Sequence, residues 1–333
     1  MLNNFVIQLS LLSCFISFVL IKNSYRICKY FSLFDVPDKK RKIHNKPIPL
    51  FGGILFITFS LFLIFYSEIL NDIETKRILF FSLIVSIIGI LDDKYGISAN
   101  LRLLIIAFII FFFIKSYPEF IISNLKIATF GINIMLPYRI AEILTILCIL
   151  LLINSFNMAD GVNGLAISIF IVWLALITNF FKSNILIIYI LIPSLFFLIQ
   201  NIKGKIFLGD SGTYFLSTTI ALLTIYFYNS ENTSNLNSIE IIYILFAFIG
   251  IDMLRLFLVR IFKGKNPFHP DLNHFHHLLL KKGFSANETI MIYVLSIAFF
   301  FIIANQNYIE IYLIILIQLL IYIFAVILLQ RSK

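Results

Sequence analysis

The chain has 333 residues, of which 60% are apolar and only 13% are charged. A soluble domain averages about 45–50% apolar residues, and so few charges could not cover a surface in contact with water. The composition therefore excludes an ordinary soluble protein and favours a single integral membrane domain over residues 1–333. The net charge of +9 does not indicate a nucleic-acid partner, because the basic residues lie in short loops between apolar runs.

Apolar runs recur along the whole chain, and a membrane-spanning helix needs ~20 mostly apolar residues. We therefore predict an all-α polytopic membrane protein with about eleven transmembrane helices. The first run has no basic segment before it and no small-residue cleavage site after it, so we expect it to remain as a helix. The predicted spans cover residues 4–21, 50–67, 78–91, 101–117, 140–156, 163–180, 185–202, 212–228, 239–262, 289–304 and 308–330.

Alternate loops differ in basic charge. One set holds 20 of the 26 lysines and arginines, and such an excess marks the cytoplasmic side of a membrane protein. This predicts an outer N-terminus and a cytoplasmic C-terminus. All five histidines and the paired aspartates fall in the same set, which predicts an active site on the cytoplasmic face. The set comprises residues 22–49, 92–102, 154–164, 203–212, 255–288 and 331–333.

The first cytoplasmic loop carries a basic run at residues 39–42. The run could serve only to orient the chain and to attract anionic lipid. Two prolines and a glycine pair follow within residues 47–53, which predicts a stiff turn and then a close approach between helices. Such a turn would hold His44 and Lys46 in place.

Asp92 and Asp93 follow an apolar run that ends at Leu91. Ionisable residues at a membrane helix are costly and are usually functional, although a solvated helix end is the alternative. Consecutive helix positions do not share a face. We therefore expect different roles for the two carboxylates, one on a metal or the attacking group and one on a basic residue.

Residues 123–136 alternate weakly between apolar and polar and contain Gly131. This pattern predicts a short hairpin on the outer face, to which we assign no chemistry.

Asn154, Asn157, Asp160 and Asn163 recur every three residues and are interleaved with glycines. Residues three apart are neighbours on a helix surface, so the spacing predicts a polar stripe that a ligand could approach. The alternative is a capped helix end followed by a polar turn.

Residues 207–212 read Phe-Leu-Gly-Asp-Ser-Gly and place Asp210 where a helix begins. Asp210 could cap that helix or bind a divalent cation. Four histidines lie within residues 269–277; they could form a zinc site, but donation to phosphate oxygens is the preferred interpretation. Asp252 and Arg255, three apart near the inner end of a span, could be a simple ion pair or could have a function.

Taken in order, these motifs resemble those of the polyprenyl-phosphate N-acetylhexosamine-1-phosphate transferases. That family includes the bacterial undecaprenyl-phosphate GlcNAc-1-phosphate transferases and the phospho-N-acetylmuramoyl-pentapeptide translocase. The matching segments are residues 35–53, 89–93, 154–165, 207–212 and 266–277.

The resemblance implies a cytoplasmic Mg²⁺ site, with Mn²⁺ as an alternative cofactor. By similarity, Asp210 is a metal ligand and Asn157 a second one. The implied catalytic residues are Asp92 as the base or the partner of the lipid phosphate, Asp93 as the support of a nearby basic group, and Asp160. The implied substrate-binding residues are His44, Lys46, Asn154, Asn163, Asp271, His274, His276 and His277.

Asn163 stands where many bacterial members have aspartate, and because an amide cannot act as a base we expect it to bind rather than to catalyse. The broken run His274-Phe-His276-His277 looks more like the GlcNAc-1-phosphate branch than the translocase.

The resemblance implies transfer of an N-acetylhexosamine-1-phosphate from a UDP-sugar to undecaprenyl phosphate, with release of UMP, at the bacterial inner membrane. Such a reaction initiates a surface polysaccharide such as O-antigen or teichoic acid. The implied partners are a UDP-N-acetylhexosamine, undecaprenyl phosphate and membrane lipids, and a homodimer is compatible with the sequence. The alternatives are the peptidoglycan translocase and, in another class, an anion transporter, which would need polar residues near the bilayer midplane.

Overall fold

A computed structural model of the chain describes residues 2–37, 46–65, 73–178, 185–230, 238–267, 271–306 and 309–331. Two compact units are considered separately below. Unit 1 comprises Met1–Ile106 and Phe181–Thr219, and unit 2 comprises Ala107–Phe180 and Ile220–Lys333. The helices α5 (Ala99–Ser116) and α9 (Gly209–Asn229) each begin in unit 1 and end in unit 2.

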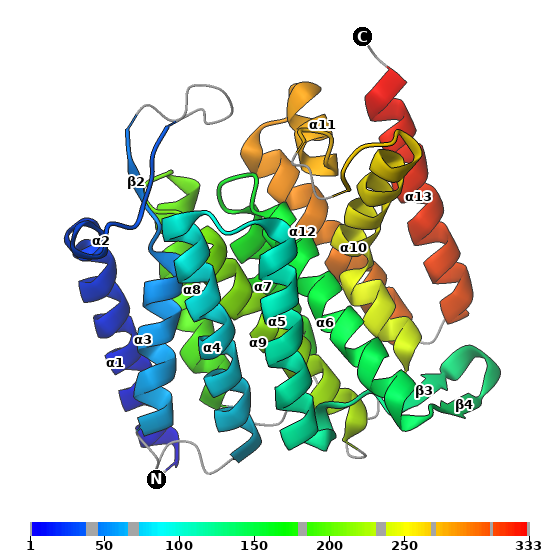
Figure 1. Cartoon of the computed structure of the whole chain (residues 1–333), viewed down its shortest axis with the longest axis horizontal. Helices are drawn as coiled ribbons and strands as arrows, with labels where there is room; N and C mark the ends of the chain where they lie inside the picture. Colours follow the sequence, from blue (N-terminus) through cyan, green and yellow to red (C-terminus); the bar gives the residue numbers. More distant parts are fainter. Residues whose placement is uncertain are drawn as a thin grey trace. The chain divides into compact units, whose positions relative to one another are not determined.

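Unit 1 is built from helices that contact one another side by side, α1 with α8, α3 with α4 and α3 with α8 (Figure 1). A two-residue antiparallel sheet joins the two ends of the first loop, with Phe34 opposite Pro49. Besides the starts of α5 and α9, its elements are α1 (Leu2–Lys22), α2 (Ser24–Phe31), β1 (Phe34–Asp35), β2 (Ile48–Pro49), α3 (Gly52–Phe65), α4 (Ile73–Tyr95) and α8 (Ile185–Ile202).

Unit 2 is a second group of packed helices with one β-hairpin. The hairpin pairs Asn124 with Met135 and Ile127 with Ile132, which confirms the hairpin predicted at residues 123–136. Its elements are η1 (Pro118–Phe120), β3 (Asn124–Ile127), η2 (Ala128–Phe130), β4 (Ile132–Met135), α6 (Tyr138–Ala159), α7 (Leu165–Thr178), α10 (Ile239–Phe262), α11 (Phe275–Lys281), α12 (Ala286–Asn305) and α13 (Ile311–Arg331).

Each of the eleven predicted apolar ranges coincides, over its described residues, with one helix. In lipid a backbone must satisfy its own hydrogen bonds, so long apolar runs become helices. Over the described residues, α5, α6, α10, α12 and α13 are long and apolar enough to cross a membrane, and the pair α1 and α2, bent by 61°, would make a sixth span. The chain is therefore an all-α polytopic membrane protein, and the count of eleven spans stays a prediction.

The third predicted span was too short. Residues 78–91 are the middle of α4, which continues in both directions over 23 residues, from Ile73 to Tyr95. Because of this extension, Asp92 and Asp93 lie on the last turns of a helix and not in a loop after it.

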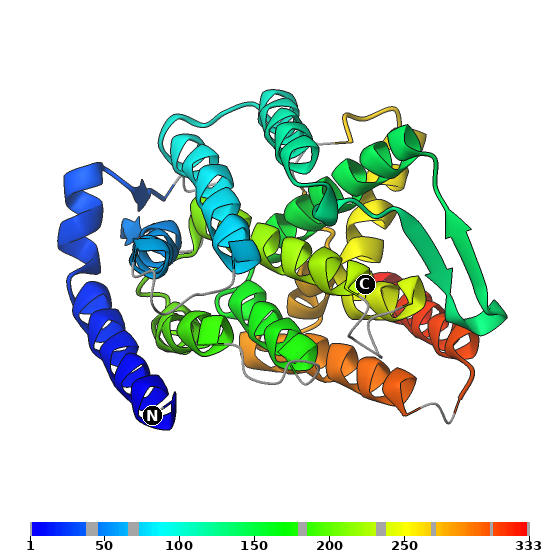
Figure 2. The ribbon, with the colours of Figure 1, turned by 90° about the horizontal axis from the view of Figure 1, so that it is seen from below.

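Helix α10 separates two polar ends of unit 2. Near its start, the Glu240 carboxylate accepts hydrogen bonds from the backbone N–H groups of Ala128 and Thr129 in the hairpin. Near its end, Arg260 donates to Asp271 in the loop that precedes α11. The rise of an α-helix places Glu240 and Arg260 about 30 Å apart, which matches the hydrocarbon thickness of a bilayer. Figure 1 shows the hairpin at the end of unit 2 away from α11, and Figure 2 shows it extending beyond the neighbouring helices.

This geometry predicts that the hairpin and the loop after α10 lie on opposite sides of the membrane, and the basic residues of the loop after α10 predict that the hairpin is outside. Single cysteines at Phe130, which is 71% exposed, and at Lys265 test it in a background without Cys14, Cys28 and Cys148. In intact cells an impermeant thiol reagent should label position 130, and position 265 only after the membrane is permeabilised. The opposite labelling pattern would invert the topology.

Candidate functional site

The start of α9 packs tightly against α3 and α4 in unit 1 because three glycines leave room for it. A Cβ atom added at Gly52, Gly53 or Gly89 would lie closer than 3.0 Å to an atom of Leu208 or Ser211. The chain also pairs here, since the N–H of Phe51 donates to the carbonyl of Phe207 and the N–H of Phe207 to that of Pro49. The first loop and residues 207–212, distant in sequence, therefore meet, as the predicted close approach required.

Asp93 binds the free backbone groups at the start of α9. Its Oδ1 accepts from the N–H of Asp210 at 2.8 Å, and its Oδ2 accepts from the N–H of Ser211 at 3.1 Å and from the Ser211 hydroxyl at 2.8 Å. The first amides of a helix have no partner within the helix, and a carboxylate suits their positive end. Asp93 thus caps α9 from another helix, which leaves Asp210 without that capping task.

Asp92 binds a different set of groups. Its Oδ1 accepts from the N–H of Ile97 at 2.7 Å, and its Oδ2 accepts from Nη1 of Arg102 at 2.5 Å. We expected a basic group beside Asp93, but the structure places it beside Asp92. The expected difference between the two acids holds, because neighbouring helix positions point in different directions.

Arg102 joins Asp92 to Asp210. Its Nη1 lies 3.5 Å from Oδ2 of Asp210, and its guanidinium lies over the Tyr214 ring at 5.7 Å from the centroid. We call Asp92, Asp93, Arg102 and Asp210 the acidic cluster. Arg102 lies outside the five sequence motifs, although an arginine at the start of an apolar run was a signal that could have found it.

The acidic cluster could supply part of the ligand set of a Mg²⁺ ion, but it does not form a complete cage around one. Among the described residues, no three His, Cys, Asp or Glu side chains form a set that could hold a metal ion. Mg²⁺ is often bound through one or two carboxylates together with substrate phosphates. The Asp210 side chain is 30% exposed, whereas that of Asp92 is 5% exposed. The carboxylate of Asp210 could therefore hold such an ion.

The polar stripe predicted in unit 2 is shorter than expected. Asn154 and Asn157 lie on α6, but the helix ends at Ala159, so Asp160 is its C-cap and Asn163 lies in the exposed turn that follows. The Asn154 amide donates to the carbonyl of Leu150 in its own helix. The glycines after Ala159 end the helix before the stripe is complete.

The three histidines at the start of α11 lie together, and we call His274, His276 and His277 the histidine cluster. The His274 and His276 rings are stacked with centroids 5.5 Å apart, and the His276 and His277 centroids are 4.2 Å apart. Among the described residues they form no set that could hold a metal ion, and His269, the fourth histidine of the zinc alternative, lies outside those residues.

Asp252 on α10 orients the histidine cluster. Its Oδ2 lies 2.9 Å from Nδ1 of His274, and both of its oxygens accept from the N–H of Phe275 at 3.2 Å. Arg255 and the Tyr322 hydroxyl donate to Oδ1. The ion pair considered from the sequence therefore exists, and its carboxylate also holds the first turn of α11. With Nδ1 engaged, Nε2 is the nitrogen of His274 left for a ligand.

His276 and His277 are neutral at physiological pH. Burial and the neighbouring histidines lower the pKa of His276 to about 3 and that of His277 to about 4. His276 is 1% exposed, and neither of its ring nitrogens has a hydrogen-bond partner among the described residues. A Cβ atom at Gly161 would collide with its Nε2, so that glycine admits the ring beside the end of α6.

Asp271 supports the loop before α11. Its Oδ2 accepts from Nε of Arg260 at 2.9 Å, and its Oδ1 accepts from the N–H of Asn273 at 2.8 Å. Burial favours the protonated form, but the hydrogen bonds from Arg260 and Asn273, together with the positive charge of Arg260, outweigh it and hold the pKa of Asp271 below its ordinary value. Lys46 is exposed next to β2, and His44 lies outside the described residues.

The fold and these clusters define a class: a polytopic membrane protein whose charged and histidine side chains gather at helix ends. A family model described as glycosyl transferase family 4 matches residues 76–228. That range includes three of the five motifs, at residues 89–93, 154–165 and 207–212.

Curated relatives extend the match over most of the chain. A probable undecaprenyl-phosphate N-acetylglucosaminyl 1-phosphate transferase of Bacillus subtilis is 27% identical over 288 residues, 82% of this chain and 77% of the relative. The undecaprenyl-phosphate alpha-N-acetylglucosaminyl 1-phosphate transferase of Escherichia coli K12 is 27% identical over 296 residues, 82% and 76% of the two chains. A Salmonella typhi protein of the same name is 26% identical over 285 residues, 80% and 74%. The chain is therefore similar to glycosyl transferases of family 4 over residues 76–228, and to undecaprenyl-phosphate N-acetylglucosaminyl 1-phosphate transferases over most of its length.

The glycine contacts predict a selective loss of stability. Gly89→Ala places a methyl group against the backbone of Ser211, which cannot move aside as a flexible side chain could. Overpacking of this kind costs about 1–3 kcal/mol, so the thermal unfolding midpoint in detergent should fall.

Gly250→Ala is the matched control, since Gly250 also lies inside a long helix and its added Cβ would meet, among the described residues, only Leu151 Cδ2 at 3.6 Å. Alanine is the better helix former, so this variant should keep or raise the midpoint. Equal effects of the two substitutions would show that the fit of α9 against α4 is not required.

Proposed function

We propose that this protein transfers N-acetylhexosamine-1-phosphate from a UDP-sugar to undecaprenyl phosphate and releases UMP. The observation that carries the proposal is the acidic cluster, in which Asp93 fixes the start of α9 and so presents Asp210 beside Arg102 and Asp92. The relatives are named as undecaprenyl-phosphate N-acetylglucosaminyl 1-phosphate transferases, which supports the proposed acceptor and the transferred group.

In the proposed reaction an oxygen of the lipid phosphate attacks the β-phosphorus of the UDP-sugar. A new bond forms between that oxygen and the β-phosphorus, and the bond from the β-phosphorus to the bridging oxygen breaks. UMP leaves with the electron pair of that bond, and the product is a polyprenyl-diphosphate sugar. Phosphoryl transfer of this kind depends mainly on positioning and on stabilisation of charge.

We assign the acidic cluster to the phosphates. Asp210, with Asn157 as a second candidate, would hold Mg²⁺, or Mn²⁺ in its place, which neutralises phosphate charge when bound. Asp92 would act as the base or as the partner of the lipid phosphate, with Arg102 orienting it. Asp93 would position Asp210 through the α9 backbone, and Asp160 remains a catalytic candidate.

We assign the histidine cluster to the sugar nucleotide. Neutral imidazoles can donate one N–H to a phosphate or sugar oxygen, and His276 has ring nitrogens for which the described residues provide no partner. Asp252 would hold His274 with Nε2 toward the ligand. Asn154, Asn163 and Lys46 are further binding candidates, with His44 outside the described residues. Asp271 would act by shaping the loop.

We further propose that the reaction takes place on the cytoplasmic face of a bacterial inner membrane. The basic loops support this side, and the prenyl-diphosphate product would be the first lipid intermediate of a surface polysaccharide. Its free sugar hydroxyls make it a substrate for enzymes that extend a glycan chain.

A reconstituted assay tests the function. Purified protein with undecaprenyl phosphate should release UMP from a UDP-N-acetylhexosamine such as UDP-GlcNAc or its 6-deoxy relative. Release should require both substrates, and added UMP should reverse the reaction. UDP-MurNAc-pentapeptide should be rejected by ~10⁴-fold, because unpaired polar groups in the binding site would oppose the wrong ligand.

Two outcomes would contradict this assignment. Turnover of the pentapeptide substrate alone would move the chain to the peptidoglycan translocases. Absence of any lipid-linked product from all the UDP-sugars would favour the transporter.

Asp210→Ala should lower the Mg²⁺-dependent rate by at least ~10³-fold, judged by the loss of one electrostatic group that acts on the transition state. Glu310→Ala is the control, because Glu310 is an exposed carboxylate immediately before α13 and also lies at a helix start. The control should retain near-normal activity. Retention of activity in a folded Asp210→Ala protein would reduce Asp210 to a stabilising charge at the start of α9.

A further inference from the structure

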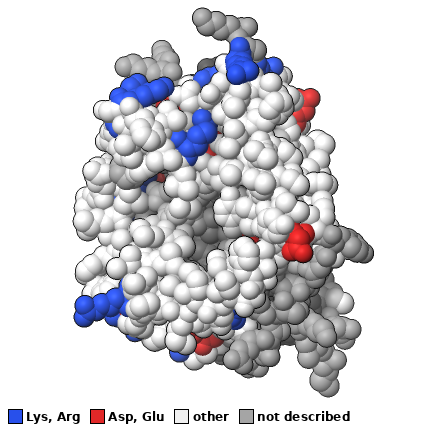
Figure 3. Space-filling view, turned by 90° about the vertical axis from the view of Figure 1, so that its right-hand side faces the viewer, with Lys and Arg blue, Asp and Glu red and all other residues white. Residues whose placement is uncertain are grey.

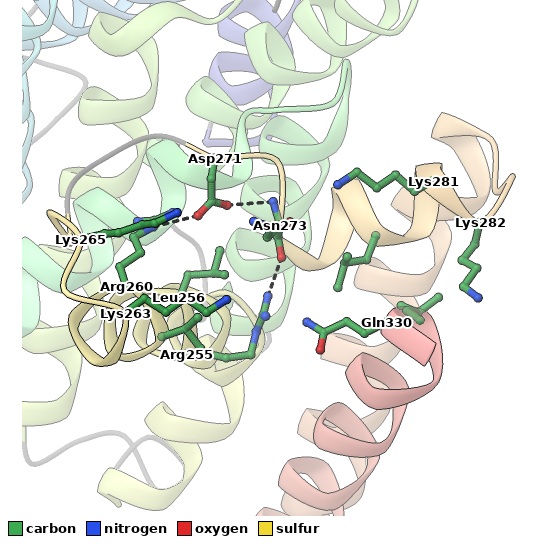
Figure 4. Close-up of a pocket in the computed structure, with 13 residues that line it drawn as sticks. Arg255, Leu256, Arg260, Lys263, Lys265, Asp271, Asn273, Lys281, Lys282 and Gln330 are labelled. Carbon is green, nitrogen blue, oxygen red and sulfur yellow. Dashed lines mark hydrogen bonds and ion pairs between the residues drawn. The ribbon is translucent and has the colours of Figure 1, made fainter. Parts of the chain in front are cut away.

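A large cavity of about 820 Å³ lies in unit 2, beside the end of α10 (Figure 4). Its volume falls within the range of pockets that hold small molecules, about 300–1,000 Å³. None of the described histidines lines it, so it is distinct from the histidine cluster. Six of the lining residues are cationic and one is acidic: Arg255, Arg260, Lys263, Lys265, Lys281, Lys282 and Asp271.

The positive charge of this cavity exceeds what its own acid can neutralise. Asp271 pairs with Nε of Arg260, while the Nη2 of Arg260 has no hydrogen-bond partner among the described residues although the residue is only 5% exposed. An unpaired buried donor is costly, and an anion in the cavity would provide its acceptor. Phosphate oxygens suit arginine and lysine donors of this kind.

The cavity also has an apolar side. Leu256 and Val259 of α10, Leu278 of α11 and Leu329 of α13 line it together with the cationic groups. Helices α10 and α13 are both long and apolar enough to cross a membrane, and the cavity lies at the end of each. Figure 3, a space-filling view, shows blue Lys and Arg side chains at the upper edge of a face whose middle is almost free of charge.

From these features we infer that the cavity binds the phosphodiester headgroup of an anionic phospholipid. Basic pockets between transmembrane helices on the cytoplasmic side favour such headgroups. The cationic side would hold the phosphate, and the leucines and the valine would contact the glycerol and the first methylene groups. A soluble phosphate compound would offer the same phosphate group to the cationic side. The apolar wall at the end of two candidate spans favours the lipid.

The chain contains a matched pair of sequences for a test. Lys263-Gly264-Lys265 follows α10 and lines the cavity, whereas Lys203-Gly204-Lys205 follows α8 in unit 1 and does not. Both central glycines have φ of +64°, so the two turns are locally alike. The variants K263A/K265A and K203A/K205A therefore remove the same charges from similar backbones, and only the first alters the cavity.

The experiment is native mass spectrometry of the purified full-length protein, titrated with dioleoyl phosphatidylglycerol or dioleoyl phosphatidylcholine. Phosphatidylglycerol should bind more tightly than phosphatidylcholine. K263A/K265A should weaken phosphatidylglycerol binding by about 25-fold, a factor of about five for each lysine, and K203A/K205A by less than twofold. Lys282→Ala, with a thermal midpoint measured for every variant, provides a second test if the double variant folds poorly, and it should weaken binding about fivefold.

Three results would overturn the inference. Equal binding of the two lipids would mean that the headgroup charge is not recognised. Equal losses in the two double variants would mean that any exposed basic turn attracts the lipid. Displacement of phosphatidylglycerol by inorganic phosphate or UDP-GlcNAc at similar concentrations would assign the cavity to a soluble phosphate compound.

Discussion

Both polar clusters depend on one kind of interaction. In it, a carboxylate on one helix accepts hydrogen bonds from the free N–H groups at the start of another element. In unit 1, Asp93 of α4 accepts from the first turn of α9. In unit 2, Asp252 of α10 accepts from Phe275, the first residue of α11. Unpaired amides and buried carboxylates are each costly in an apolar environment, and each satisfies the other.

This arrangement also determines where Asp210 and His274 lie. Asp210 supplies one of the amides that Asp93 holds, and His274 immediately precedes Phe275, whose amide Asp252 holds. A side chain attached to such a fixed backbone has few orientations available, so it is organised before a ligand arrives. Preorganised charges and donors are the main means by which proteins stabilise phosphoryl transfer. The same device serves a structural purpose where Glu240 holds the β3–β4 hairpin.

Small residues make these contacts attainable. Gly89 lets the backbone of α9 reach α4, and Gly161 lets the His276 ring reach the end of α6. Neither glycine carries a functional group, yet each determines where a candidate site residue lies. In a membrane protein, where helices must pack closely without a hydrophobic force between them, such positions take on this role.

The sequence by itself determined the helices, because apolar runs in lipid have no other way to satisfy their backbone groups. It also determined the resemblance to a family, through five motifs in order, and the hairpin at residues 123–136, whose alternation is local. It indicated that Asp92 and Asp93 differ, from their adjacent positions on a helix.

Only the tertiary structure decided which partner each acid has. Arg102 is near Asp92 and not Asp93, and Asp252 holds His274 from 22 residues away. The structure also decided between the two readings of residues 154–163, because α6 ends at Ala159 and a turn follows, as in the alternative, so Asp160 and Asn163 are not part of a helical stripe. Periodicity describes one helix at a time, whereas these contacts depend on the angle and distance at which separate helices pack. Side-chain volumes set that angle and distance, and the spacing of motifs gives no information about them.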